Sequence, residues 1–382
     1  NFKDLDFKTE SFIEVSGIIK ENLSVKLHGL ELDVKEIKIM ITPTEELPIS
    51  WKNEGYPSLT ERLDYRNISL REPKIHLVFE IMSFFEFKVR EFTYKNKITE
   101  IHSPKILGAP SESGAELFEL EYFDKKAYLA QSPQFYKQMG IASGFGKVME
   151  VGPVFRADPS FTSRHMTEFI GLDFEISPIE SHYDLMKFEE DFLVFIFSEI
   201  KKEFDKKIKE LFGIEIIVPT KPFPKISFKE AVEILKKNYD LIISDQEDIN
   251  AIGEKKLFDY IKKEFDHDFV FITEYPWYVR PFYHMKLEED LTLTKSADLI
   301  YSGVEITTLA QREHRYEILK SQAIEKGLNL EKIQFYLDFF KYGIPPHGGM
   351  GLGMQRIFAK LFGFETIKEM AFIPRDPKRI FP

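Results

Sequence analysis

The sequence predicts an α+β protein whose largest part is an antiparallel sheet flanked by helices. Two observations predict this class. The segment from Gly152 to Ile176 has a charged loop with a strand pattern at each end, which is typical of an antiparallel hairpin. Long segments in which apolar residues recur at helical spacing lie before and after it, at residues 74–94 and 182–212.

Composition narrows the class of protein further. The chain has 382 residues, enough for about two domains, and 43% of them are hydrophobic and 30% charged, which is ordinary for a globular protein. There is no apolar run of membrane-spanning length, no signal-peptide pattern and no cysteine for disulfides or thiolate metal sites. The simplest expectation is a cytoplasmic protein with no membrane partner. The net charge of −11 argues against nucleic-acid binding by the whole surface, but it allows a local basic patch.

The first 48 residues are expected to form a small β domain. Gly17 and Gly29 punctuate its strands, which are too few to close a barrel. The predicted strands are residues 12–19, 30–34 and 37–41. A linker at residues 49–68 should follow, and the main domain should occupy residues 69–382.

Within the main domain, the segment 74–94 has the apolar spacing of a core-facing helix. Its expected core residues are Ile75, Val78, Phe79, Met82 and Phe85. A helical insertion at about 182–268 is expected, with helices at 182–212, 228–237 and 248–265, and strands at 269–275 and 277–285 should follow it.

The second strand of the Gly152–Ile176 segment alternates between a core face and a polar face. The core face carries Ile170, Leu172, Phe174 and Ile176, and the other carries Phe169, Gly171, Asp173 and Glu175. On the second face a ring can stack on a base, the glycine leaves room for a ligand, and a carboxylate can hold an ammonium group. Arg156 and Arg164 on the loop side suit phosphate. The alternative is a hairpin with a charged tip.

A second hairpin should turn at Ser302-Gly303. If Tyr301 pairs with Val304, Glu305 lies on the face that carries Asp298, and the two carboxylates are diagonal neighbours, roughly 7–8 Å apart at the backbone. Such a pair can share Mg²⁺ with phosphate oxygens. The alternative is a pair of exposed hairpin acids.

Two further patterns indicate ligand contacts. Ser132 and Pro133 predict the N-cap and first residue of a helix, which puts Gln134 and Lys137 on one face. The alternative for Lys137 is an ordinary exposed lysine. A glycine run comprises Gly348, Gly349, Gly351 and Gly353. Too few residues follow it for a dinucleotide-binding unit, so close approach of the backbone to a nucleotide is the better explanation.

Three segments in this order resemble the motifs of class II aminoacyl-tRNA synthetases, in the aspartyl, asparaginyl and lysyl subgroup. Residues 101–105 resemble motif 1, residues 152–158 with 163–169 resemble motif 2, and residues 347–356 resemble motif 3. The resemblance runs from about Leu63 to the last residue. The strands before it resemble the closing strands of an anticodon-binding OB barrel. A further N-terminal segment is therefore expected in the natural protein.

The resemblance implies an ATP site. Arg156 would bridge the substrate carboxylate and the α-phosphate, Arg164 and His165 would face the other phosphates, and Phe169 and Arg356 would cover the two faces of adenine. Asp298 and Glu305 would hold Mg²⁺. The implied ATP-binding residues are Arg156, Asp158, Arg164, His165, Met166, Phe169, Glu305, Gly353 and Arg356, of which Arg156 and Arg356 would be catalytic.

Within the family the pattern resembles the aspartyl members of the archaeal and eukaryotic cytosolic type. Lys137 and Arg312 would grip the aspartate side chain. The implied aspartate-binding residues are Ser111, Glu112, Gln134, Lys137, Asp173 and Arg312, with Glu112 and Asp173 at the α-ammonium. The implied activity is formation of aspartyl-adenylate from ATP and L-aspartate, followed by transfer to the 3′ end of tRNA(Asp). A homodimer formed through motif 1 is also implied.

Two residues depart from the family pattern. Gln355 stands where a glutamate is usual, and Leu309 stands where a glycine is usual, so Leu309 is expected to add bulk beside the amino-acid pocket. Strict alternation from Glu305 would also leave Arg312 on the opposite face, so a bend or bulge is required. An ammonia-dependent ligase resembling asparagine synthetase and a non-catalytic tRNA-binding paralogue remain as alternatives. Charging of tRNA(Asn) is also left open.

Overall fold

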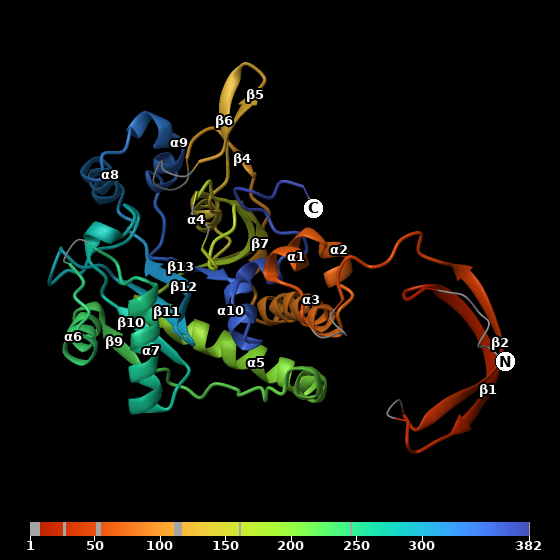
Figure 1. Cartoon of the computed structure of the whole chain (residues 1–382). Helices are drawn as coiled ribbons and strands as arrows, with labels where there is room; N and C mark the ends of the chain where they lie inside the picture. Colours follow the sequence, from red (N-terminus) through yellow and green to blue (C-terminus); the bar gives the residue numbers. More distant parts are fainter. Residues whose placement is uncertain are drawn as a thin grey trace. The chain divides into compact units, whose positions relative to one another are not determined.

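The computed structural model describes residues 8–25, 28–50, 55–110, 117–159, 162–244 and 247–381. The chain divides into two compact units, Asn1–Glu72 and Pro73–Pro382 (Figure 1). Among the described residues, no helix is both long enough and apolar enough to cross a membrane.

The first unit contains a two-stranded antiparallel ribbon, β1 (Phe12–Glu21) and β2 (Leu30–Ile41), followed by helices α1 (Leu59–Asp64) and α2 (Arg66–Ser69). The prediction of two strands between residues 30 and 41 was wrong. Ser16 pairs with Glu36 and Gly17 pairs with Val34, so Lys35 is accommodated as a bulge and the strand continues. Gly17 lies inside β1, where a Cβ would come within 2.3 Å of the Asp33 carbonyl oxygen.

A central sheet organises the second unit. In the described part of the chain it has eight strands in the order β3-β7-β8-β13-β12-β11-β10-β9. Neighbouring strands are antiparallel, except for the parallel pairs β3·β7 and β9·β10 at the two edges. The strands are β3 (Thr99–Glu100), β7 (Lys147–Phe155), β8 (Glu168–Ile176), β13 (Gly348–Gly353), β12 (Val304–Gln311), β11 (Ser296–Tyr301), β10 (Phe269–Thr273) and β9 (Lys225–Ser227).

Helices cover this sheet (Figure 1). The two long helices α3 (Pro73–Lys95) and α5 (His182–Phe212) pack against the core face, together with α10 (Met354–Leu361). Phe85 of α3 contacts Phe192 of α5 and Phe358 of α10 edge to face, with ring centroids 6.3 and 5.3 Å apart. The predicted core faces of the 74–94 helix and of β8 are therefore confirmed.

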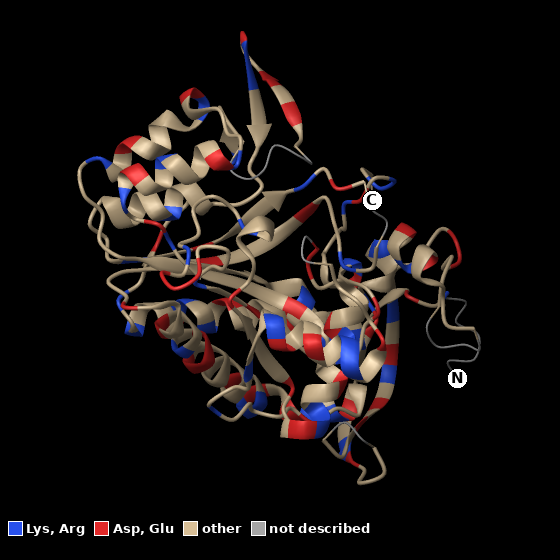
Figure 2. Cartoon of the chain, turned by 90° about the vertical axis from the view of Figure 1, so that its left-hand side faces the viewer, with Lys and Arg blue, Asp and Glu red and all other residues tan. Residues whose placement is uncertain are grey.

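The remaining elements complete the unit. They are β4 (Ile106–Leu107), β5 (Glu119–Tyr122) and β6 (Lys125–Leu129) in a small sheet, the helices α4 (Gln134–Ala142), α6 (Phe228–Tyr239), α7 (Ala251–Phe265), α8 (Tyr316–Glu325) and α9 (Leu330–Phe340), and the 3₁₀ turns η2 (Trp277–Val279) and η3 (Ile367–Met370). On the side seen in Figure 2, acidic and basic residues are interspersed along the helices. One ion pair between two helices joins Lys88 of α3 to Glu199 of α5 at 2.5 Å.

Two local predictions in this unit need correction. The segment 277–285 is not a strand. Trp277–Val279 is a 3₁₀ turn, and Pro281 lacks the N–H that a strand ladder needs. Within the segment only His284 forms a bridge, with Arg312. The fourth helix begins at Gln134, so Pro133 and not Ser132 occupies its cap position. The Ser132 hydroxyl still accepts a hydrogen bond from the Gln134 N–H at 3.2 Å.

The β11–β12 hairpin forms in the predicted register. Ser302 and Gly303 make the turn with φ angles of 47° and 78°, Tyr301 pairs with Val304, and Ile300 pairs with Glu305. Leu299 then pairs with Thr307, which leaves Ile306 as an extra residue. Because side chains alternate with period two, this bulge moves Thr308 and Arg312 onto the face of Glu305. This bulge is the irregularity that was expected from the sequence, because strict alternation would have left Arg312 on the opposite face from Glu305.

Candidate active site

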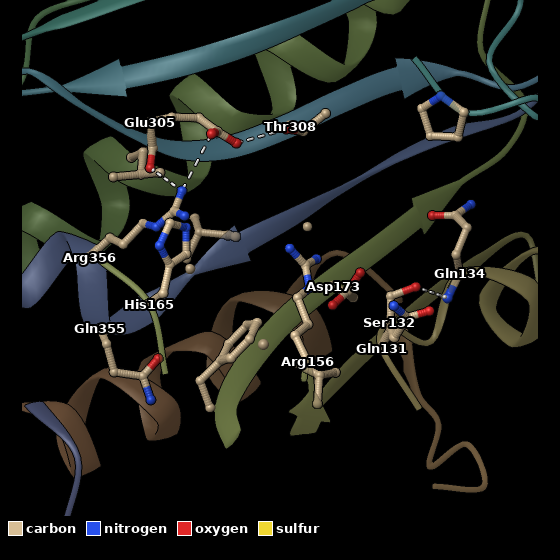
Figure 3. A pocket seen from close by; sticks show the side chains of 18 of the residues that line it. Gln131, Ser132, Gln134, Arg156, His165, Asp173, Glu305, Thr308, Gln355 and Arg356 are labelled. Atoms are coloured by element: carbon tan, nitrogen blue, oxygen red, sulfur yellow. Dashed lines mark hydrogen bonds and ion pairs between the residues drawn. The ribbon is translucent and has the colours of Figure 1, made fainter. Parts of the chain in front are cut away.

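A cavity of about 340 Å³ is lined by residues of β7, β8, β12, β13 and α4, by the first turn of α10 and by the loops beside them. It brings together most of the predicted site residues. Those lining it are Gln134, Lys137, Arg156, Asp158, Arg164, His165, Met166, Phe169, Asp173, Glu305, Arg312, Gly353 and Arg356. Figure 3 shows Arg356 and Glu305 at one end, Gln134 at the other, and Arg156 with Asp173 between them. Ser111 and Glu112 lie outside the described residues.

Two buried cations and two acids form the end of the cavity near Gln134. Lys137 Nζ lies 2.8 Å from Asp173 Oδ1 and 3.5 Å from Glu175 Oε2. Arg312 Nε donates to Glu175 Oε1 at 3.0 Å, and its Nη2 donates to Gln134 Oε1 at 3.2 Å. Burial raises the pKa of Glu175, but Arg312 and Lys137 outweigh it and hold that pKa below its usual value. Glu175 and its partner Arg312 therefore form a charged pair near neutral pH.

Glu175 was placed on the correct face by the sequence pattern but was not predicted as a site residue. Its surroundings also explain part of the glycine run. A Cβ on Gly349 would lie 2.1 Å from Glu175 Oε2, and a Cβ on Gly348 would lie 2.6 Å from the Ala310 carbonyl oxygen. Close approach to a nucleotide is therefore the wrong explanation for these two glycines. Gly351 and Gly353 do line the cavity.

The opposite end of the cavity is rich in arginine. The Arg356 Nη1 donates to the Glu305 carbonyl oxygen at 2.8 Å and lies 3.4 Å from Glu305 Oε2. Thr308 Oγ1 donates to the other carboxylate oxygen of Glu305 at 2.9 Å. The guanidinium of Arg156 lies 5.6 Å from the centre of the Phe169 ring. Two cations and an aromatic face thus surround the space between the ends.

The loop between β7 and β8 is tied to a distant helix. Arg164 Nη1 lies 2.9 Å from Glu254 Oε2 of α7, and its Nη2 donates to the Gly303 carbonyl oxygen at 3.1 Å. Glu254 Oε2 also accepts from the Glu305 N–H at 2.8 Å. Glu254 could not be predicted as a site residue, because it lies in an ordinary amphipathic helix with no local signal for this contact.

Asp298 lies beneath this end, buried and outside the cavity lining. Arg280 Nη2 donates to Asp298 Oδ2 at 2.6 Å, while Oδ1 is buried and has no hydrogen-bond partner in the described part of the chain. Burial raises the pKa of Asp298 to about 7, and Arg280 opposes that rise. No cluster of three or more His, Asp or Glu side chains suited to a metal occurs among the described residues. A cation held by Asp298 and Glu305 would need further oxygens from a ligand.

The two departures from the family pattern have clear positions. Leu309 is fully buried in the main core, on the opposite face of β12 from Thr308, so the expectation that it crowds the pocket was wrong. Gln355 is buried in the wall of the cavity. In the amide orientation that satisfies both of its polar atoms, it donates to the Ile170 carbonyl oxygen at 3.1 Å and accepts from the Ile170 N–H at 3.3 Å. An ionised glutamate could not make the first of these bonds.

Comparison with known proteins gives a consistent result. The family described as tRNA synthetases class II (D, K and N) matches residues 58–377. The chain is 42% identical over 378 residues to an aspartate–tRNA(Asp/Asn) ligase of Aeropyrum pernix, covering 99% of this chain and 85% of the relative. It is 40% identical over 374 residues to an aspartate–tRNA(Asp) ligase of Pyrococcus abyssi, covering 98% and 85%. Among solved structures, the asparaginyl-tRNA synthetase of Pyrococcus horikoshii with asparaginyl-adenylate matches with a TM-score of 0.90 and 32% identity, covering 98% of this chain and 85% of that one.

Proposed function

The chain belongs to the class II tRNA synthetases of the D, K and N group, and we propose that it is an aspartate–tRNA ligase. The observation that carries the choice of aspartate is the buried pair Lys137 and Arg312 in the same cavity as Arg156 and Arg356. The enzyme would join L-aspartate to ATP as aspartyl-adenylate and then transfer the aspartyl group to the 3′ end of tRNA(Asp).

A charge count supports aspartate over asparagine. The charges of Lys137, Arg312, Asp173 and Glu175 cancel when no amino acid is bound. The α-ammonium of a bound amino acid, held at Asp173, adds one positive charge. The side-chain carboxylate of aspartate cancels that charge, whereas the amide of asparagine leaves it buried and uncompensated, which is costly. The pocket therefore favours aspartate even though both cations already have acidic neighbours.

The first step needs positioning and charge stabilisation more than it needs a proton acceptor. An oxygen of the α-carboxylate attacks the α-phosphorus, an O–P bond forms, and the bond to the β-phosphate oxygen breaks to release pyrophosphate. Arg156, between the two ends of the cavity, is suited to hold both the carboxylate and the α-phosphate. Phe169 and Arg356 are suited to the two faces of adenine, and Arg164 and His165 to the outer phosphates.

We propose Asp298 and Glu305 as ligands for Mg²⁺, which would supply positive charge to the phosphate oxygens. The residues fit this role because Asp298 Oδ1 is a buried acceptor with no described partner. Arg280 fixes the orientation of the Asp298 carboxylate, and Thr308 fixes that of Glu305. Asp158, Met166 and Gly353 are proposed as further contacts with ATP.

The partners beyond the small molecules are also proposals. Residues 1–48 would contribute to an OB-type anticodon-binding domain, followed by a linker at 49–68. The α3 helix with residues 101–105 would form the two-fold interface of a homodimer. A tRNA ligase of this kind would act in the cytoplasm. Ser111 and Glu112 would close over the amino acid, with Glu112 meeting the α-ammonium.

The proposal is tested by ATP–pyrophosphate exchange with each standard amino acid in turn. We expect exchange with aspartate alone at physiological concentrations. Asparagine is the competitor to examine most closely, because the solved relatives include asparaginyl enzymes. Equal exchange with asparagine would contradict the proposed substrate.

A further inference from the structure

His284 is a buried side chain that lines the cavity and has no role in the proposed mechanism. It is 2% exposed and lines the cavity, but its Nδ1 is buried without a hydrogen-bond partner among the described residues. Leaving a buried polar group unpaired destabilises a fold, so such groups call for an explanation. A partner that arrives with the substrate is one explanation.

The backbone fixes where His284 lies. It bridges Arg312 in an antiparallel pair, in which the Met285 N–H donates to the Gln311 carbonyl oxygen and the Glu313 N–H donates to the Tyr283 carbonyl oxygen, both at 3.0 Å. This pattern defines a pair without mutual hydrogen bonds, which brings two side chains closest together and on one face. His284 is therefore a direct neighbour of Arg312.

The charge state of the imidazole limits what it can bind. Burial lowers the pKa of His284 well below its usual value, and the nearby cations Arg312, Arg280 and Lys137 lower it further. The ring is neutral near pH 7 and carries one donor and one acceptor. Because a neutral imidazole adds no charge to the pocket, the net charge of the pocket still favours a substrate side chain with one negative charge.

We propose that His284 is a substrate-binding residue that donates a hydrogen bond to the side-chain carboxylate of bound aspartate, beside Lys137 and Arg312. The inference rests on the proposed function. A carboxylate has about four acceptor positions and no donor. The two cations share their hydrogen-bonding capacity with Asp173, Glu175 and Gln134, so a third, neutral donor completes the coordination of the ligand.

Steady-state exchange kinetics test this contact. The His284→Leu variant should raise the KM for aspartate by about tenfold or more, as expected for loss of a hydrogen bond to a charged group. Its KM for ATP should stay within about twofold of wild type, because the contact lies at the amino-acid end. His284→Gln keeps a donor and should recover most of the affinity. A KM for aspartate within about twofold of wild type in His284→Leu would overturn the proposal.

His182 supplies a matched control. It is also a buried histidine, with both ring nitrogens unpartnered among the described residues, but it does not line the cavity. His182→Leu should leave the KM for aspartate unchanged. If both leucine variants raised that KM equally, the effect would be structural and the specific contact would be refuted. Aspartate-dependent exchange by the wild type reports separately on the proposed function.

A second measurement needs no destabilising substitution. With ¹³Cε1-labelled histidine in the full chain, the His284 signal can be assigned by its loss in His284→Gln. We expect that signal to shift when aspartate is added and to stay in place when ATP is added alone. A His284 signal that saturating aspartate leaves unmoved would contradict the contact, even if the leucine variant fails to fold.

Discussion

Replacing Lys137 by methionine removes one charge from the amino-acid pocket while nearly keeping the side chain's length. The lysine is 1% exposed and lies 2.8 Å from Asp173 and 3.5 Å from Glu175. In the variant, the bound α-ammonium only restores neutrality, so the carboxylate of aspartate becomes an uncompensated buried charge. Truncating one partner of a buried charge pair costs about 2–5 kcal/mol. A loss of about 3 kcal/mol corresponds to about 150-fold in kcat/KM for aspartate.

The assay is pyrophosphate exchange with aspartate and with asparagine at matched ATP concentration. Neutral asparagine should lose much less activity than aspartate, so the ratio of the two kcat/KM values should fall by about two orders of magnitude. Lys368→Met is the matched control. Lys368 Nζ also pairs with a buried aspartate, Asp376, at 2.8 Å, but it lies outside the cavity lining. A wild-type ratio in Lys137→Met, or an equal fall in both variants, would refute the charge argument.

Three further predictions test other parts of the structure. Glu305→Ala should lower the pyrophosphate exchange rate at least about a hundredfold at any Mg²⁺ concentration. Its melting temperature should shift by only a few degrees. A near-normal exchange rate would contradict the proposed metal site. Leu309→Ala should lower the free energy of unfolding by about 2–5 kcal/mol in denaturant melts and leave the KM for aspartate unchanged, because Leu309 is in the core. A change in that KM would indicate that Leu309 contacts the amino-acid pocket. Burial raises the pKa of Glu189 from 4.5 to about 8, so between these pH values the folded protein holds a proton that the unfolded chain has lost. The free energy of unfolding should therefore fall as pH rises from 5 to 8. Glu189→Gln should flatten the plot of melting temperature against pH over that range.

The sequence was most informative where the structure depends on neighbouring residues. The turn at Ser302-Gly303 fixed the pairing of Tyr301 with Val304, because a two-residue loop with positive φ angles permits few registers. The alternation of β8 likewise placed Asp173 on the ligand face, where it lines the cavity. In both cases successive side chains of a strand point to opposite faces, so the register determines which side chains face the cavity.

Contacts between distant segments could not be predicted in the same way. Glu254 and Arg280 lie in segments with no motif, and only tertiary packing brings them to Arg164 and Asp298. The position of the bulge at Ile306 depends on how β11 pairs, although Arg312 showed that some irregularity was required. The strand expected at 277–285 did not form, because its first residues make a 3₁₀ turn and Pro281 lacks the N–H that a ladder needs.

We propose that this chain attaches aspartate to tRNA. The most direct measurement is the ATP-dependent transfer of labelled aspartate, and in parallel of labelled asparagine, to purified tRNA(Asp) and tRNA(Asn) transcripts. We expect aspartate to be attached to tRNA(Asp), and the label on tRNA(Asn) decides whether the second tRNA is also used. Attachment of asparagine, or no transfer to tRNA(Asp) under conditions that support aspartate-dependent exchange, would contradict the account.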